Sequence, residues 1–419
     1  RFQESDDETG LAMAIPLAHF NVSNLRGGNN KAYRKLLCFT DHRQRAAAFP
    51  SLLEEETFVH DMGRKIVKIV NGSKEPFDLV ALGIKLSEIA DIHSGEYDPD
   101  FFLPVSRLPD DLPSDSRQKR NIFTNLWIGE TISYFGIPDS ARESAEDLGL
   151  VSVRFQVTKE QTNQFNSILS KFNLSPEDAD SLLQVLLGFI RQRKAFTLPN
   201  GVSPDDPAFG RVIADISYVL RREGIRNTNG WLPSLNKDGS FRDNMITDYL
   251  RRVLQLPSGE VLSVAENIWD FITSQDILIG KQDRWKLDHE RIVIVKPSSR
   301  FVCNRCGIVT TSSSRHVCPR KECAVRLEGQ PFNASKENII ARWVAGEGVP
   351  QFTGLKSEEH TAQINKDLAR IIENEFRAEG INLLSSTTTF EMGINIGDLS
   401  KILLRNAPPN SASYVQRVG

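Results

Sequence analysis

The strongest constraint on the fold is that two similar segments lie near opposite ends of the chain, separated by a long stretch of different character. The apolar run Lys35–Phe39 predicts a buried strand, and the Ala-rich segment Thr40–Phe49 after it predicts a turn and a helix. The next segment of this kind begins near residue 355. We therefore expect residues 31–60 and 350–419 to form one α/β domain with a parallel sheet, interrupted by an insertion at its surface, where insertions cost little.

Residues 61–296 predict a mostly α-helical insertion, and residues 1–30 read as a polar linker or domain edge. The segments expected to be helical are Asp78–Ile92, Asn121–Tyr134, Leu182–Ile190, Ala208–Arg222, Arg242–Leu254 and Val261–Ser274. Short apolar segments then follow up to Val295. Helices followed by such a hairpin fit either a winged helix at about residues 240–296, which would lie against duplex DNA, or a scaffold α/β subdomain.

Four of the five cysteines predict a metal site at residues 297–330. They form a C-x2-C and a C-x4-C pair separated by eleven residues: Cys303, Cys306, Cys318 and Cys323. Two close pairs of thiolates are typical of a zinc ribbon, in which Zn²⁺ is closed off by four sulfur ligands and has a structural role. Gly307 allows a tight turn under the metal, and Ile308–Val317 is expected to form a short hairpin. The surrounding basic residues contact a nucleic-acid backbone or are ordinary solvated charges: Arg305, Arg315, Arg320, Lys321 and Arg326.

Composition limits the location and the partners of the chain. The net charge of −3 gives no overall basic footprint, so a nucleic-acid surface has to be local. The sequence has neither an apolar run long enough to span a membrane nor a signal peptide, and Cys38 stands apart from the other cysteines. These features predict a cytoplasmic protein with no membrane partner. Since the chain begins at Arg1 rather than Met, we expect it to be a fragment of a longer polypeptide.

Several motifs resemble those of superfamily 2 helicases. Lys35–Phe49 resembles motif IV, Ser386–Asp398 resembles motif V, and Gln416–Gly419 resembles the start of motif VI. The sequence is most similar to the Lhr/MrfA-like branch, and within it to the large phage-defence helicases of the DISARM and Druantia type. These also carry the segment seen here as Glu359–Gln363 and the turn seen as Asn406–Pro409.

The resemblance implies that this chain holds the second RecA-like domain of an ATP-dependent DNA helicase or translocase in antiviral defence. Such a motor binds ATP and Mg²⁺ between two RecA-like domains, so the partner would be the first RecA-like domain of the same polypeptide, with a defence-complex subunit as a further partner. By the same resemblance, Arg43, Thr387 and Thr388 would bind the backbone of DNA that has a single-stranded part.

The resemblance also implies a set of nucleotide-binding residues. Gly393 would allow the backbone to come close to the nucleotide. Asn395 stands where the family often has Asp, and the Asn side chain keeps the hydrogen-bonding shape of Asp but lacks its charge. Gln416 and Arg417 would face the nucleotide as catalytic groups. The alternative is a non-catalytic DNA-binding or assembly module, built from a degenerate RecA-like fold and the zinc ribbon.

Two nucleotide motifs are missing from the 419 residues. The sequence contains no G-x-x-x-x-G-K-[ST] loop and no D-E-x-[HD] motif, and it ends at Gly419, before the arginines expected in motif VI. Because those arginines stabilise the transferring phosphoryl group, we expect this chain alone not to hydrolyse ATP. Nucleic-acid-stimulated turnover by the chain alone would contradict this expectation.

Overall fold

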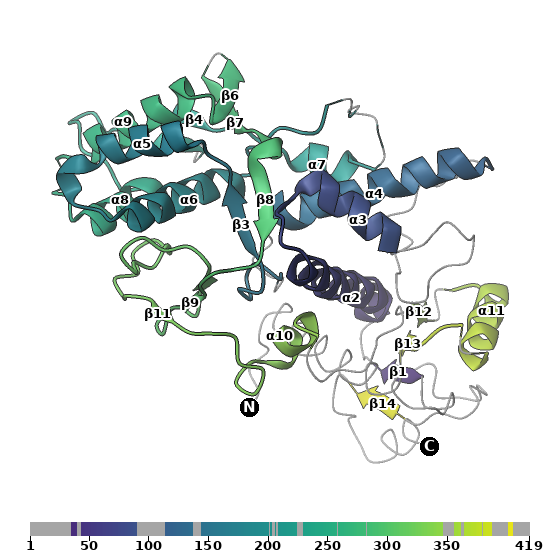
Figure 1. Cartoon of the computed structure of the whole chain (residues 1–419). Helices are drawn as coiled ribbons and strands as arrows, with labels where there is room; N and C mark the ends of the chain where they lie inside the picture. Colours follow the sequence, from purple (N-terminus) through teal and green to yellow (C-terminus); the bar gives the residue numbers. More distant parts are fainter. Residues whose placement is uncertain are drawn as a thin grey trace. The chain divides into compact units, whose positions relative to one another are not determined.

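The structure is a computed structural model of the chain (Figure 1). The chain divides into two compact units. The sheet unit comprises residues 1–64, 90–110 and 336–419, and the helical unit comprises residues 65–89 and 111–335. The residues that the structure describes are 35–39, 43–89, 114–136, 144–200, 202, 206, 208–223, 229–257, 259–281, 283–346, 356–361, 364–378, 380–387 and 401–404.

The sheet unit contains a four-stranded parallel sheet in the order β12-β13-β1-β14. Its strands are β1 (Leu36–Phe39), β12 (Ser357–His360), β13 (Leu383–Ser386) and β14 (Lys401–Leu404). In register, Phe39 lies opposite Ser386 and Leu404, and His360 lies opposite Ser386. The carboxyl ends of all four strands therefore meet at one edge, and the predicted α/β class with a parallel sheet is confirmed.

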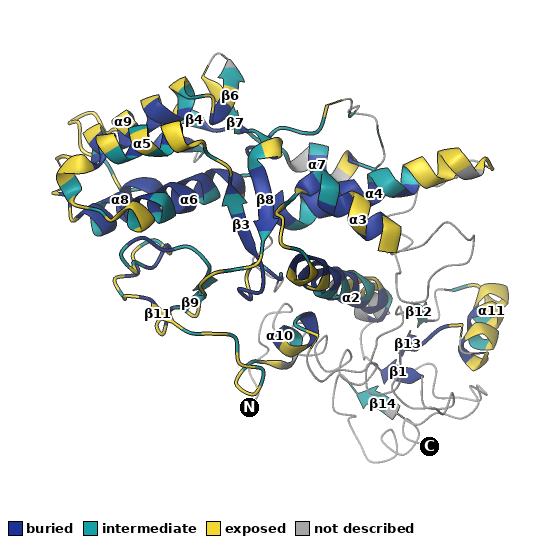
Figure 2. Cartoon of the chain, in the orientation of Figure 1, coloured by how far each residue is buried: buried dark blue, intermediate teal, exposed yellow. Residues whose placement is uncertain are grey.

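Three helices belong wholly or partly to the sheet unit: α2 (Arg43–Gly72), α10 (Ile339–Val344) and α11 (Lys366–Arg377). α11 begins where the Asn365 side chain accepts a hydrogen bond from the backbone N–H of Leu368 at 2.8 Å. Its inner residues Ile372 and Phe376 are buried against the sheet, while its outer face is exposed (Figure 2). Each such buried side chain contributes about 1.5–3 kcal/mol, so this face decides how α11 packs.

A half-buried carboxylate links α2 to the edge strand of the sheet. Glu54 Oε1 accepts hydrogen bonds from the backbone N–H of Ser357 at 2.6 Å and from its hydroxyl at 3.0 Å. The Ser357 hydroxyl also lies 2.9 Å from the carbonyl oxygen of Pro50, so its one proton is shared between these two acceptors. Burial raises the pKa of Glu54 above its usual range, and the bonds from Ser357 only partly offset that effect.

We expect Glu54→Gln to make the chain more stable than the wild type near neutral pH. Because the folded chain binds this proton more tightly than the unfolded chain, wild-type stability falls as pH rises from the unfolded pKa through the folded pKa. Glutamine keeps an oxygen that accepts from Ser357 but has no charge to bury. Thermal melting between about pH 4 and about pH 8 should show a gain that disappears at the acidic end. Glu75→Gln, at an exposed position, is the control, and an equal gain there would contradict the explanation.

The helical unit is built mainly from α-helices. Its helices are α3 (Leu79–Ile89), α4 (Ser116–Gly136), α5 (Lys159–Ile168), α6 (Pro176–Gln192), α7 (Gly210–Asp215), α8 (Met245–Leu254) and α9 (Val261–Ser274), with 3-10 turns at Ser170–Phe172 and His289–Arg291. Its strands are β2 (Phe77–Asp78), β3 (Ser152–Phe155), β4 (Leu220–Arg222), β5 (Gly230–Leu232), β6 (Leu278–Lys281), β7 (Arg284–Leu287) and β8 (Ile292–Val295). β2, β8 and β3 form one sheet, β4 pairs with β5, and β6 pairs with β7.

The helix predicted over Ala208–Arg222 is wrong in its second half. α7 ends at Asp215, and β4 pairs with β5 instead. The backbone N–H of Val219 also donates to the carbonyl of Trp285 at 2.8 Å, so partners distant in the sequence override the local helical pattern.

The α8, α9 and β6–β7 order is consistent with the predicted winged helix, but the surface of α9 argues against a role in reading DNA. α9 contains neither Lys nor Arg. Its polar residues Glu266 and Asp270 form ion pairs with Arg222 and Arg221 of β4. α9 therefore offers no cation of its own to a phosphate backbone, and its acids are used in contacts within the unit, which favours the scaffold alternative.

The four-cysteine module, residues 297–330, contains a small antiparallel sheet. Its strands are β9 (Phe301–Val302), β10 (Val309–Thr310) and β11 (Glu328–Gly329), in the order β10-β9-β11. The hairpin expected within Ile308–Val317 is wrong, because β10 pairs with β9 across the first cysteine pair. Gly307 has φ +73°, so it supplies the predicted tight turn between these two strands.

Candidate functional site

The four cysteines of the module meet in a single cluster. Their sulfur atoms lie within 4.8 Å of one another, and the Cys303–Cys323 and Cys306–Cys318 sulfur pairs are each 3.6 Å apart. A tetrahedral zinc with Zn–S bonds of about 2.3 Å separates its sulfurs by about 3.8 Å. The thiols are therefore arranged to hold a metal ion such as zinc, and His316 is not part of the cluster.

The protein surroundings shift the pKa values of three of the thiols, and not all in the same direction. Burial raises the pKa of Cys306 and of Cys318. Burial also opposes ionisation of Cys303, but backbone N–H groups of Cys306 and Arg305 donate to its sulfur and lower its pKa to about 6. Four thiolates carry four negative charges in a small volume, so a dication is needed to hold them together.

A helix outside the module supports the second cysteine pair through one arginine. Arg252 of α8 donates through Nη1 to the carbonyl oxygens of Cys318 and Cys323, at 2.7 and 2.8 Å. Its Nη2 donates to the carbonyl of Arg320 at 3.1 Å, and its Nε and Nη2 both donate to Asp248 Oδ2. All five N–H groups of the guanidinium are thus used, and the backbone around two ligands is fixed.

Asp248 adds a second bond between α8 and the module. It lies one helical turn before Arg252, and its Oδ2 accepts from the backbone N–H of Glu322 at 3.2 Å. Sequence reasoning missed both residues. Their spacing of four indicates an ion pair on a helix, but nothing in the sequence indicates that the pair meets the cysteines.

The loop between the two cysteine pairs is also bonded to the helical unit. The Tyr249 hydroxyl accepts from the backbone N–H of Ser314 at 3.1 Å, and the Ser314 hydroxyl donates to the carbonyl of Asp178 at 2.8 Å. The Arg315 guanidinium donates to the carbonyls of Val253, Phe172 and Asn173. The module is therefore an integral part of the helical unit.

At the sheet edge, the predicted site residues follow adjacent parallel strands. Arg43 is the first residue of α2, shortly after β1, and Thr387 directly follows β13. Thr387 is 2% exposed, and the neighbouring Ser386 hydroxyl donates to the carbonyl of His360 at 3.0 Å. The Arg43 side chain and residues Thr388, Gly393, Asn395, Gln416 and Arg417 lie outside the described residues.

The same edge holds an imidazole–carboxylate pair that the sequence did not indicate. His360, the last residue of β12, has its Nε2 3.0 Å from Glu373 Oε1 of α11. The contact joins an edge strand to the helix that covers the sheet.

Comparisons with known proteins agree with the motifs. Residues 333–419 match the family model described as the helicase conserved C-terminal domain. The chain is 40% identical over 131 residues to Druantia protein DruE of Escherichia coli (strain UMEA 4076-1), and the match covers 28% of this chain and 7% of that protein. No solved structure gives a significant match. Among the described helices, none is both long and apolar enough to cross a membrane.

The residues that match the family model supply three of the four strands of the parallel sheet. β12, β13 and β14 lie within residues 333–419, whereas β1, which pairs with both β13 and β14, comes from residues 36–39. Residues 333–419 are a helicase C-terminal domain, and the resemblance to superfamily 2 helicases near the Druantia-type phage-defence group is confirmed.

Proposed function

We propose that the chain contributes the second RecA-like motor domain of an ATP-dependent DNA helicase or translocase that acts in phage defence. Residues 31–60 and 350–419 would form this domain, and the helical insertion with its four-cysteine module would belong to the same machine. The matched helicase domain and the partial identity to a Druantia protein support the proposal.

The observation that carries the proposal is the strand register. β1 and β13 are parallel neighbours with Phe39 opposite Ser386, so the segments that follow them start at the same sheet edge. β14 ends at that edge too, with Leu404 opposite Phe39. Ligands of parallel α/β sheets bind at the carboxyl ends of the strands. Motif IV, which contains β1, and the start of motif V at Ser386 therefore reach the edge where such ligands bind, which supports the proposal. Motif VI lies outside the described residues.

Each predicted residue has a proposed part in this motor. Arg43, Thr387 and Thr388 would hold backbone phosphates of the tracked strand. Gly393, Asn395, Gln416 and Arg417 would line the nucleotide cleft. ATP with Mg²⁺ supplies the free energy for stepping, and the chain's own residues bind, orient and couple the two ligands.

We assign the four-cysteine site a structural role with Zn²⁺. A zinc ion held by all four sulfurs of Cys303, Cys306, Cys318 and Cys323 would have no position left for water or substrate, which is typical of structural zinc. The arginine and carbonyl contacts from α8 support this role, because they fix the ligand backbone rather than open a coordination site.

The strand path is tested by replacing one proposed phosphate contact at a time. We expect Arg43→Ala, and Thr387→Val, which keeps the buried shape, to weaken single-stranded DNA binding by roughly tenfold, since a hydrogen bond to a charged group is worth about 1.5–3 kcal/mol. The slope of log affinity against log salt should fall by about 0.7 in Arg43→Ala and stay unchanged in Thr387→Val, which removes no charge. The control is Arg370→Ala, an exposed arginine of α11. If neither variant differs from this control, the strand path is wrong.

The motor itself is tested in a longer polypeptide that includes the first RecA-like domain. We expect its ATP hydrolysis to be stimulated by single-stranded DNA and to be lost in Arg417→Ala. Hydrolysis-independent DNA binding with no turnover would favour the non-catalytic module instead.

A further inference from the structure

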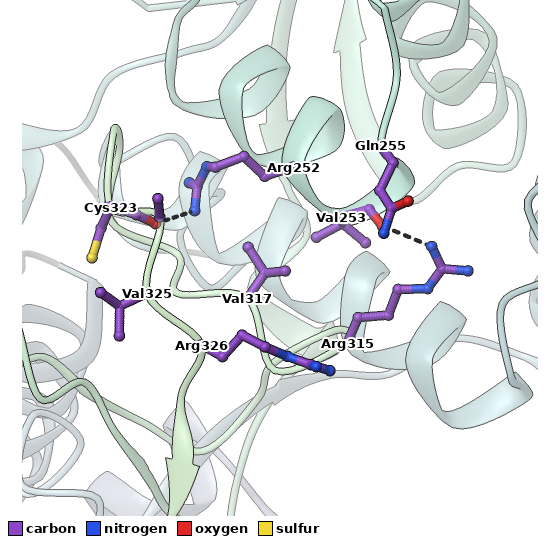
Figure 3. A pocket seen from close by; sticks show the side chains of 9 residues that line it. Arg252, Val253, Gln255, Arg315, Val317, Cys323, Val325 and Arg326 are labelled. Atoms are coloured by element: carbon purple, nitrogen blue, oxygen red, sulfur yellow. Dashed lines mark hydrogen bonds between the residues drawn. The ribbon is translucent and has the colours of Figure 1, made fainter.

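A cavity of about 480 Å³ lies in the helical unit, between the C-terminal end of α8 and the second half of the four-cysteine module (Figure 3). Its lining combines three arginines, Arg252, Arg315 and Arg326, with three valines, Val253, Val317 and Val325. Among the described residues that line it, none carries a carboxylate. The volume falls in the range of pockets that bind small organic ligands, about 300–1,000 Å³.

The three arginines differ in the donors that they leave for a ligand. Arg252 uses all five N–H groups on Asp248 and on backbone carbonyls, so it has none left. Arg315 uses three, all on neutral carbonyl oxygens. In the part of the chain that the structure describes, the exposed Arg326 side chain makes no ion pair or hydrogen bond. Seven N–H groups on two uncompensated cations therefore remain available.

The backbone that presents Arg315 is unusual. Arg315 and His316 both have left-handed conformations, with φ of +48° and +58°. A non-glycine residue in this region costs on the order of 1–3 kcal/mol and persists only where the surroundings impose it. Here Asp178 accepts from the backbone N–H of Arg315, and the backbone N–H of Leu327 donates to the carbonyl of His316 at 2.7 Å. The loop is thus held in the conformation that places this guanidinium at the cavity.

The metal ligand in the lining does not compete for the cavity. Figure 3 shows the Cys323 side chain directed away from the Arg252 guanidinium, while the Cys323 carbonyl accepts from it. The cavity therefore presents both guanidinium groups and valine side chains, and the Cys323 sulfur belongs to the thiol cluster.

We propose that this cavity binds one nucleotide unit of a single-stranded nucleic acid. Arg315 and Arg326 bind the phosphate, for which planar guanidinium donors are well suited, and the valines contact the sugar or base. A base paired in a duplex cannot leave the stack to enter such a cavity without the cost of unpairing. The inference rests on the proposed function for its choice of ligand, and it adds a strand contact outside the motor motifs.

The test compares two charge reversals in the zinc-loaded 419-residue chain. Arg326→Glu places a carboxylate at the cavity, and Arg305→Glu makes the same charge change at an exposed arginine of the module that does not line it. We expect Arg326→Glu to weaken binding of a twelve-nucleotide single strand by about tenfold or more, and the salt slope to fall by about 0.7. Arg305→Glu should stay within about twofold, and binding of the matching duplex should not change.

Equal effects of the two reversals, or a wild-type chain that does not bind the single strand, would overturn the proposal. Zinc content and thermal melting establish that both variants are folded. The experiments distinguish a wrong assignment of the cavity from a wrong assignment of the motor function. If only the cavity assignment is wrong, the longer polypeptide still hydrolyses ATP in response to single strands, whereas a non-motor protein loses that response and keeps the Arg326-dependent binding.

Discussion

Cys318→Ser is expected to abolish metal binding and to unfold the four-cysteine module. The three strands of the module have two residues each, and its buried cluster is Cys303, Cys318, Cys323 and Leu327. So little apolar burial cannot hold a fold, whereas structural zinc supplies about 10–16 kcal/mol of apparent binding free energy in zinc-finger peptides. Metal analysis should find one zinc per wild-type chain and none in the variant.

Loss of the metal should also weaken the helical unit beyond the module. Asp178 of α6 and both Tyr249 and Arg252 of α8 form hydrogen bonds with the module. These bonds require the module to be folded. We expect chelation to lower the melting temperature of the helical unit and to speed amide exchange at the C-terminal end of α8. Cys38→Ala, which alters the buried cysteine of β1, is the control and should keep its zinc. A Cys318→Ser chain with wild-type zinc content and melting would refute the assignment.

Local sequence patterns predict the helical elements of this fold well where capping and packing agree. Ser175 and Pro176 begin α6 as their residue types predict, with the Ser175 hydroxyl accepting from the backbone N–H of Asp178 at 3.0 Å. Val261–Ser274 is helical over the predicted range, because its apolar positions face the core with helical spacing. At Leu220–Arg222 the pattern fails, since pairing with distant strands decides the conformation.

The candidate sites also differ in how far the local sequence predicts them. Cysteine spacing alone predicts which thiols meet, because a metal ligand set is local in the chain. The residues proposed for the motor were predicted from the resemblance to helicase motifs, and the pairing of β1 with β13 brings only the segments of Arg43 and Thr387 to the same sheet edge. The support from α8 is not predictable from sequence, because it depends on where an unrelated helix packs.

Arg252→Ala is expected to have a large effect on both the metal site and stability. The substitution leaves Asp248, whose side chain is 12% exposed, without its partner, and it removes the donors to three carbonyls of the module. Breaking a buried pair costs about 3–5 kcal/mol, and loss of a group supporting the ligands lowers metal affinity by about 10–100-fold. Arg252→Lys keeps the charge but not the planar fork, so it should recover only part of both losses.

The matched control is Arg242→Ala, because Arg242 reaches the same part of the module through Glu322, at 3.7 Å, but is 86% exposed. Exposed pairs contribute about 0–1 kcal/mol, so this variant should be close to the wild type. Asp248→Asn in the Arg252→Ala background should regain stability, since it removes the uncompensated charge. Zinc competition with a chelator and thermal melting measure the two effects. If Arg252→Ala behaves like Arg242→Ala in both, the module is not held through α8, and the cysteines bind their metal without help from the helical unit.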